Sequence, residues 1–447
     1  MPQLPPTPSI TPPVFRRQFQ VCLVLWCYGV LNTARSLSLF DSSLTFTLLF
    51  LIMRLFFFAA ALPLISAYDL HVPTPNDEVV VVASTTNEHT PDVGKSVYSA
   101  PPVIKPGECT KPVVRREWRT LSNGDKKAWI DALKCAGNLP HSDTLYKTRL
   151  SGGIPLINET SSHYDDWTYA HIDTYTKSQV TALFFPWHRW YLDSFERVLK
   201  TRCNFNGTMP YWNWSLDVAN LSKSPIFDPD PVYGLGTWGT EANNWHVTDG
   251  AFNETIRAYP VPHTIRRQWT PQPFDENVLF PLEYPNKQAW ANETATHIKI
   301  QAIIDGNRGD SDMFFADIEG VREQGVRNAI QLAVGGDLAA PTTNPADPLF
   351  WLHHAMLDRV FAMWQAKYPE NADSYSGGSM QALTELDEWP TGLPPMVNTK
   401  SLLPVSGLEA HDVAVEQVMS ITSNYKNKWT GFSGGRLCYT YDNMLYA

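Results

Sequence analysis

The sequence predicts a mainly α-helical fold, in which one folded domain combines marked helices with long ordered loops. The segments PWHRWYLDSFERVLKTRC and DPLFWLHHAMLDRVFAMWQ carry apolar residues at helical spacing. The segment GVRNAIQLAVGGD indicates a short buried helix that two glycines end. Residues 204–310, in contrast, are rich in Pro, Trp and Asn without a clear period, which is typical of loops.

The composition indicates a folded protein with a large core. The 447 residues include 16 Trp, 18 Tyr and 21 Phe, and only 18% are charged. The net charge is -10 and the pI is about 5.6. Nucleic acids and anionic membranes attract basic surfaces, so this charge argues against both as partners.

The N-terminus has the order of a secretory signal within residues 53–67. Met53 and Arg54 precede the apolar run LFFFAAALPLIS, and a small residue, Ala67, follows. We therefore expect residues 1–52 to be a mis-annotated extension and the mature protein to be secreted. The rival interpretation is a membrane anchor over about residues 44–67, which Arg54 interrupts.

Residues 68–106 are rich in Pro, Thr and Val and predict a flexible leader, so the folded domain is expected at 107–447. Four cysteines lie in that domain: Cys109, Cys135, Cys203 and Cys438. An even number of cysteines in an exported protein favours two disulfides over free thiols, with three pairings open. An exported chain is also expected to be a glycoprotein. Six sequons are present, at Asn158, Asn206, Asn213, Asn220, Asn253 and Asn292. Asn213 is expected to be too buried to carry a glycan.

Local residues indicate where several of the predicted helices begin. The first, in REWRTLSNGDKKAWIDALKCAG, has Ser122 as an expected N-cap. The next, PWHRWYLDSFERVLKTRC, carries Trp187 and Tyr191 on one face. The last, DPLFWLHHAMLDRVFAMWQ, is expected to open with Asp347 as cap and Pro348 at its first position. The C-terminal segment TGFSGGRLCYTYDNMLYA is too irregular to place.

Three of the twelve histidines have a local context that indicates function. His171 lies in HYDDWTYAHIDTY, His188 in the aromatic helix FFPWHRWYLDSFE, and His354 in DPLFWLHHAMLDRV. Asp358 follows His354 by one helical turn and could orient a metal-binding imidazole. The alternative is that Asp358 forms a salt bridge with Arg359 or its neighbours.

These segments resemble a known family. DPLFWLHHAMLD and FFPWHRWYLDSFE are similar to the two copper signatures of tyrosinases, catechol oxidases and molluscan haemocyanins. YDDWTYAHIDTY, PYWNWSLD and VGGDL resemble the short secreted fungal members, over about residues 109–365. The resemblance implies a tyrosinase-like four-helix bundle core whose six imidazoles, three per copper, bind dioxygen and oxidise phenols.

Only three of the six ligand positions implied by the resemblance hold histidine. The first copper's positions hold His171, Gln179 and His188. In the second half, a His-x-x-x-His pair has become Arg327 and Gln331, and His354 remains. Arginine stays protonated and repels a cation, so two coppers are not expected.

The remaining histidines favour a single metal, either copper or zinc, held by His171, His188 and His354. Arg327 would then supply a fixed positive charge beside a phenolic substrate, with Asn328 next to it as a second expected catalytic residue, and Phe350 lining the pocket. The resemblance to the fungal members implies that such a protein tailors an aromatic secondary metabolite of a fungus. Two alternatives stay open: a metal-free pseudoenzyme or binding protein of the same fold, and an ordinary copper phenol oxidase with unusual ligands.

Overall fold

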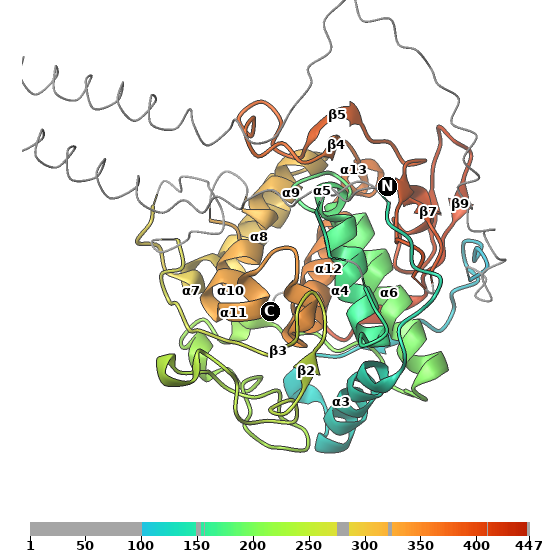
Figure 1. Cartoon of the computed structure of the whole chain (residues 1–447). Helices are drawn as coiled ribbons and strands as arrows, with labels where there is room; N and C mark the ends of the chain where they lie inside the picture. Colours follow the sequence, from blue (N-terminus) through green and yellow to red (C-terminus); the bar gives the residue numbers. More distant parts are fainter. Residues whose placement is uncertain are drawn as a thin grey trace, which may run out of the picture. The chain divides into compact units, whose positions relative to one another are not determined.

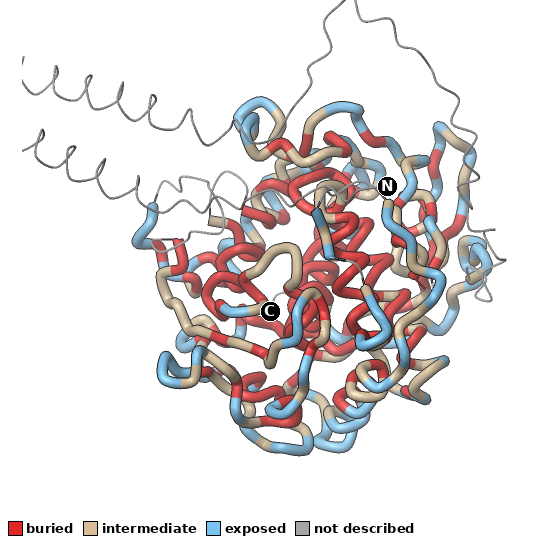
Figure 2. Tube along the Cα trace, viewed as in Figure 1, coloured by how far each residue is buried: buried red, intermediate tan, exposed pale blue. Residues whose placement is uncertain are grey.

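The two long helices α6 (Phe184–Arg202) and α12 (Leu349–Lys367) pack against each other in the middle of the fold. Both were predicted from the sequence. Figure 1 shows where they lie, and most of their residues are buried, as the red colour at the same place in Figure 2 indicates. Aromatic rings fill the contact, and the rings of Phe195 and Trp351 stack with their centroids 3.7 Å apart. Such stacked pairs add to the stabilisation that burial of apolar surface already gives.

The computed structural model describes residues 101–148, 153–155, 157–274, 286–320, 324–408 and 410–444, all within the unit Thr90–Ala447. The expected extension, the signal peptide and all of the leader except its last six residues therefore lie outside the described residues. No helix in the described ranges has the length and apolar character needed to cross a membrane.

Helices α3 (Asn123–Asn138) and α4 (His163–Asp173) lie beside this pair and contact each other. Ser122 caps α3, as expected, because its hydroxyl accepts a hydrogen bond from the Asp125 amide. Ser162 caps α4 and exchanges hydrogen bonds with Asp165 in a capping box. These caps fix where α4 begins, and therefore where His171 lies near its other end.

The fourth helix of the core is α10 (Val326–Val334), whose residues are all buried. It contacts α7 (Ala291–Thr294), α9 (Ser311–Glu319) and α11 (Gly336–Ala339). Gly335 ends α10 with φ of 69°, and a Cβ at this position would lie 2.3 Å from a backbone oxygen. Only glycine fits there. Helices α4, α6, α10 and α12 confirm the predicted mainly α fold.

Two details of the sequence-based prediction differ from the structure. Helix α12 begins at Leu349, and Asp347 accepts a hydrogen bond of 2.9 Å from the Leu349 amide, so its capping contact lies just before the helix. Helix α8 (His297–Gly306) lies in the region expected to be loops. The sequence did not predict this helix, because its two buried residues, Ile300 and Ile304, are one turn apart and belong to no longer apolar repeat.

The other elements are short. The remaining helices are η2 (Trp118–Thr120), α5 (Tyr175–Ser178), η3 (Trp214–Leu216), η4 (Leu221–Lys223), η5 (Glu241–Asn243), η6 (Asn344–Ala346), α13 (Pro369–Asp373) and η7 (Val415–Gln417). Antiparallel pairs join β2 (Ile256–Arg257) to β3 (His263–Thr264), β4 (Gly378–Met380) to β5 (Leu393–Met396), β6 (Leu402–Leu403) to β7 (Val413–Ala414), and β8 (Tyr425–Lys426) to β9 (Ser433–Gly434).

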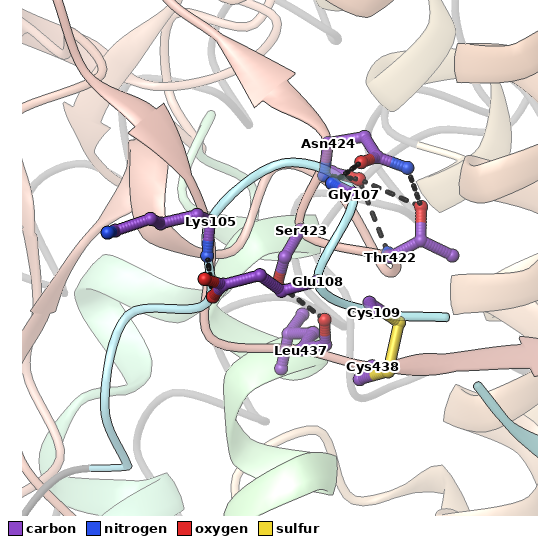
Figure 3. Close-up of a disulfide and its surroundings, with 10 residues drawn as sticks. Lys105, Gly107, Glu108, Cys109, Thr422, Ser423, Asn424, Leu437 and Cys438 are labelled. Carbon is purple, nitrogen blue, oxygen red and sulfur yellow. Dashed lines mark hydrogen bonds between the residues drawn. A yellow bond between two sulfur atoms is a disulfide. The ribbon is translucent and has the colours of Figure 1, made fainter. Parts of the chain in front are cut away.

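The C-terminal segment that the sequence left unplaced returns to the start of the domain. Strand β10 (Tyr439–Tyr441) pairs in parallel with β1 (Val113–Arg115). The disulfide Cys109–Cys438 closes the same junction, where the Gly107 amide donates a 3.1 Å hydrogen bond to Asn424 (Figure 3). A second disulfide joins Cys135 to Cys203, so the two expected disulfides are confirmed with one of the three possible pairings.

Asp358 belongs to a buried ion cluster and does not orient His354. Its carboxylate lies 2.5 Å from Arg189 and 3.7 Å from Arg115, and accepts hydrogen bonds of 2.6 Å from Tyr439 and Tyr441. Burial raises the pKa of Asp358, but the two arginines outweigh it, and the pKa lies below its usual value. A salt bridge was therefore correctly anticipated, but the expected partners were wrong: the structure gives Arg115 of β1 and Arg189 of α6, which are not sequence neighbours of Arg359.

Substitution Asp358→Asn should lower the free energy of unfolding by about 3–5 kcal/mol, because it leaves the buried guanidinium of Arg189 without its carboxylate and removes one of the two carboxylates beside Arg115. Urea unfolding followed by tryptophan fluorescence measures the change. The matched control is Asp131→Asn, which breaks a surface pair with Lys127 whose side chains are 51% and 53% exposed. Its effect should stay within about 1 kcal/mol, and equal effects of the two substitutions would contradict the role of the cluster.

Candidate functional site

The structure brings the six positions implied by the resemblance into one buried cluster, here called the altered centre. Helix α4 supplies His171, α6 supplies His188, and Gln179 follows α5. Helix α10 supplies Arg327 and Gln331, and α12 supplies His354. All six side chains belong to residues no more than 3% exposed: His171, Gln179, His188, Arg327, Gln331 and His354.

The first two histidines are neutral and turn one lone pair inward. Nδ1 of His171 lies 2.8 Å from the Thr342 carbonyl oxygen, and Nδ1 of His188 lies 2.8 Å from that of Phe184. Because a carbonyl oxygen only accepts, Nδ1 carries the proton in both rings and Nε2 is left as an acceptor. Burial lowers the pKa of His171 to about 3, and Arg327 acts in the same direction. The pKa of His188 is also lowered by burial.

Gln179 occupies the space between these two acceptors. Its amide nitrogen lies 3.2 Å from Nε2 of His171 and 3.4 Å from Nε2 of His188. Its amide oxygen accepts a hydrogen bond from the Arg327 guanidinium. An arginine only donates, so this contact fixes which end of the amide faces the histidines. One glutamine therefore joins the two halves of the altered centre.

His354 lies in the second half of the centre. Its Nε2 is 3.3 Å from the Gln331 amide nitrogen, and Nδ1 has no hydrogen-bond partner in the described part of the chain. Its ring stacks on that of His188, with centroids 4.2 Å apart and planes inclined by 12°. The ring of Phe350 lies 4.2 Å from that of His354, in agreement with its expected place beside the centre.

The donor atoms present do not fit the two coppers of the resemblance. Two imidazoles face one half and a single imidazole faces the other, where Arg327 adds a positive charge. Copper sites of this kind need about three nitrogen donors each. The described residues also contain no group of three or more His, Cys, Asp or Glu that could hold a metal ion.

A single metal on three histidines would require rearrangement. The stacked rings of His188 and His354 direct their in-plane lone pairs side by side, whereas shared ligands converge on one point. A metal at His171 and His188 would also have to displace the Gln179 amide. The ligand role of the three histidines therefore stays a prediction.

Glu319 is a buried carboxyl group that the sequence reasoning missed. It ends α9 and accepts a 3.2 Å hydrogen bond from the amide of Val180, the residue after Gln179. Burial raises the pKa of Glu319 to about 7, while Arg327 opposes the shift. Nothing in the local sequence distinguishes Glu319 from a surface carboxylate at a helix end, because its burial arises only when α9 packs against α10.

Asn328 and two histidines that lie near the expected ligands in sequence make contacts of their own. Asn328 donates a 2.8 Å hydrogen bond to the Gly320 carbonyl and so ties the start of α10 to the end of α9. The catalytic roles expected for Asn328 and Arg327 stay predictions. His163 pairs with Asp166 at the start of α4, 2.8 Å away, and His353 accepts from Trp214 at 3.2 Å.

Comparison with known proteins gives the family. Residues 161–367 match the model of the common central domain of tyrosinase. The tyrosinase-like protein phomQ1' of Diaporthe leptostromiformis is 30% identical over 75% of this chain and 82% of its own length. Tyrosinase ustQ of Aspergillus flavus is 29% identical over 74% and 80%.

The solved structures agree on the fold. A polyphenol oxidase mutant from Thermothelomyces thermophila superposes with a TM-score of 0.55, over 74% of this chain and 89% of its own, at 22% sequence identity. The matched domain contains all six positions of the altered centre. The chain therefore belongs to the tyrosinase family, as a member similar to the fungal tyrosinase-like proteins.

Proposed function

We propose that this chain is a secreted tyrosinase-like protein that acts on a phenolic compound at a centre without the copper pair of its family. The observation that carries the proposal is the contact chain from Arg327 through Gln179 to His171 and His188. Coupled dicopper chemistry needs three imidazoles per metal. This chain has two imidazoles at the positions of the first copper and one at the positions of the second. The chain is therefore expected to act on a phenolic substrate but not to oxidise it with dioxygen.

Arg327 supplies the chemistry of the proposed centre. A guanidinium fixed in a water-poor site stabilises an oxyanion strongly, so it suits a bound phenolate or a negative charge that develops during reaction. The guanidinium also lies 5.5 Å from the ring centroid of Phe184. Phe184 and Phe350 offer the aromatic faces against which a phenol ring would pack.

A second candidate is a binding protein that performs no reaction. The observation that favours it is that Nε2 of His171, His188 and His354 each faces an amide nitrogen. Imidazole nitrogens that already accept hydrogen bonds hold a pocket in place without preparing a reactive group. A single copper or zinc is the further variant, and it needs Gln179 to move away from the two imidazoles.

Secretion and a role in fungal secondary metabolism also belong to this proposal. The two disulfides support export, because disulfides persist in oxidising compartments.

The six sequons differ in how far their asparagines are exposed to solvent. Asn213 is buried, and the Asn292 amide nitrogen donates a 2.8 Å hydrogen bond to a backbone carbonyl. Glycans are therefore expected at the four exposed sequons, Asn158, Asn206, Asn220 and Asn253.

Binding of 4-nitrophenol should test the oxyanion role of Arg327, because the absorbance of this probe distinguishes phenol from phenolate. The wild-type protein should bind the phenolate form and lower the apparent pKa of the probe. Arg327→Met should weaken binding by tenfold or more, on the order of a lost charged hydrogen bond. The matched control is Arg308→Met, which breaks an exposed pair with Glu370. Equal affinity of wild type and Arg327→Met would exclude the proposed role.

Restoring the missing imidazoles should restore the chemistry of the family. The triple variant with Gln179→His, Arg327→His and Gln331→His is expected to gain dioxygen uptake with catechol after copper loading. Gln179→His alone should show none, because the second half would still hold one imidazole beside a guanidinium. Uptake by the copper-loaded wild type at the rate of the triple variant would show that the unaltered chain is an ordinary phenol oxidase.

A further inference from the structure

Arg257, far from the altered centre in sequence, is a buried cation without a carboxylate. The residue lies in β2 and is 2% exposed. Its Nε donates a 2.9 Å hydrogen bond to the Ala346 carbonyl, and its guanidinium stacks on the Tyr164 ring at 3.7 Å. Nη2 has no hydrogen-bond partner, and no carboxylate of the described residues lies within ion-pair distance.

Three other buried arginines of the described structure, Arg115, Arg189 and Arg267, do have carboxylate partners. Arg267 forms two 2.8 Å hydrogen bonds with Asp347, and Arg115 lies 3.0 Å from Glu196. Leaving a buried charge without its counter-charge lowers the stability of the fold by roughly several kcal/mol. Arg257 lacks the counter-charge that these three arginines have, and an anion would supply it.

A polar pocket of about 600 Å³ opens beside Arg257. Helix α3 contributes Lys134 and Gly137 to its wall, and a Cβ on Gly137 would lie 3.7 Å from Nη1 of Arg257, so the guanidinium edge reaches the wall beside this glycine. Lys134 has no carboxylate partner among the described residues, and its ammonium lies 5.8 Å from the Phe252 ring. The one carboxylate on the described wall belongs to the exposed Glu254.

We infer that this pocket binds a small oxyanion, a carboxylate or a phosphate, between the guanidinium of Arg257 and the ammonium of Lys134. A planar guanidinium edge matches two oxygens of such a group, and the lysine adds a second positive charge at the rim. The site is separate from the altered centre and does not depend on the proposed function.

Titration calorimetry with inorganic phosphate and, separately, acetate tests the site in the folded, disulfide-bonded protein. The Asn253→Gln background removes any glycan at the sequon that lines the pocket. Saturable binding of either anion is expected, and the tighter one identifies the ligand class. Arg257→Met should weaken it by about tenfold or more. Absence of binding by both anions, or equal affinity in Arg257→Met, would overturn the inference.

Two wall substitutions keep the test decisive if Arg257→Met does not fold. Lys134→Gln should weaken anion binding by about threefold, and Glu254→Gln should strengthen it by a similar factor, because one removes an attractive charge and the other a repulsive one. Neither side chain is buried. Changes in the same direction, or no change in either variant, would also overturn the inference. Arg327→Met should leave this binding unaltered, which separates the pocket from the altered centre.

Discussion

The hydrogen bond between the Arg327 guanidinium and the Gln179 amide determines the character of the altered centre. It connects α10 to the segment between α4 and α6, and it fixes the amide so that its nitrogen faces His171 and His188. The two histidines can accept these contacts because backbone carbonyls hold their Nδ1 protons. Burial keeps the imidazoles neutral, so the centre carries the charge of Arg327, opposed by the nearby Glu319.

The fold that holds this centre depends on a second polar cluster, around Asp358. Arg115 comes from the first strand, Arg189 from α6, and Tyr439 and Tyr441 from the last strand, so one carboxylate ties both ends of the domain to the central helices. The disulfide Cys109–Cys438 closes the same junction. The scaffold of the family therefore remains intact, while the six positions that the resemblance implies as ligands hold only three histidines. This is why a similar fold does not by itself establish the same reaction.

The helices of the core could be predicted from the sequence because their apolar residues repeat over several turns, as in α6 and α12. The six positions of the centre could be found because long signatures surround them. Contacts between distant segments could not be predicted. The alignment of β10 with β1, the burial of Glu319 and the orientation of the Gln179 amide all depend on packing between elements far apart in sequence. Asp358 shows the same limit, since its partners are not its helical neighbours.

The metal content of the purified protein tests most directly the proposal that this centre does not hold a copper pair. The wild-type chain would be expressed with copper and zinc both supplied, and its metals counted per chain by plasma mass spectrometry. A centre filled by Gln179 and Arg327 should hold no stoichiometric metal, and the triple histidine variant should serve as the positive control. Two coppers per wild-type chain would contradict the proposed centre.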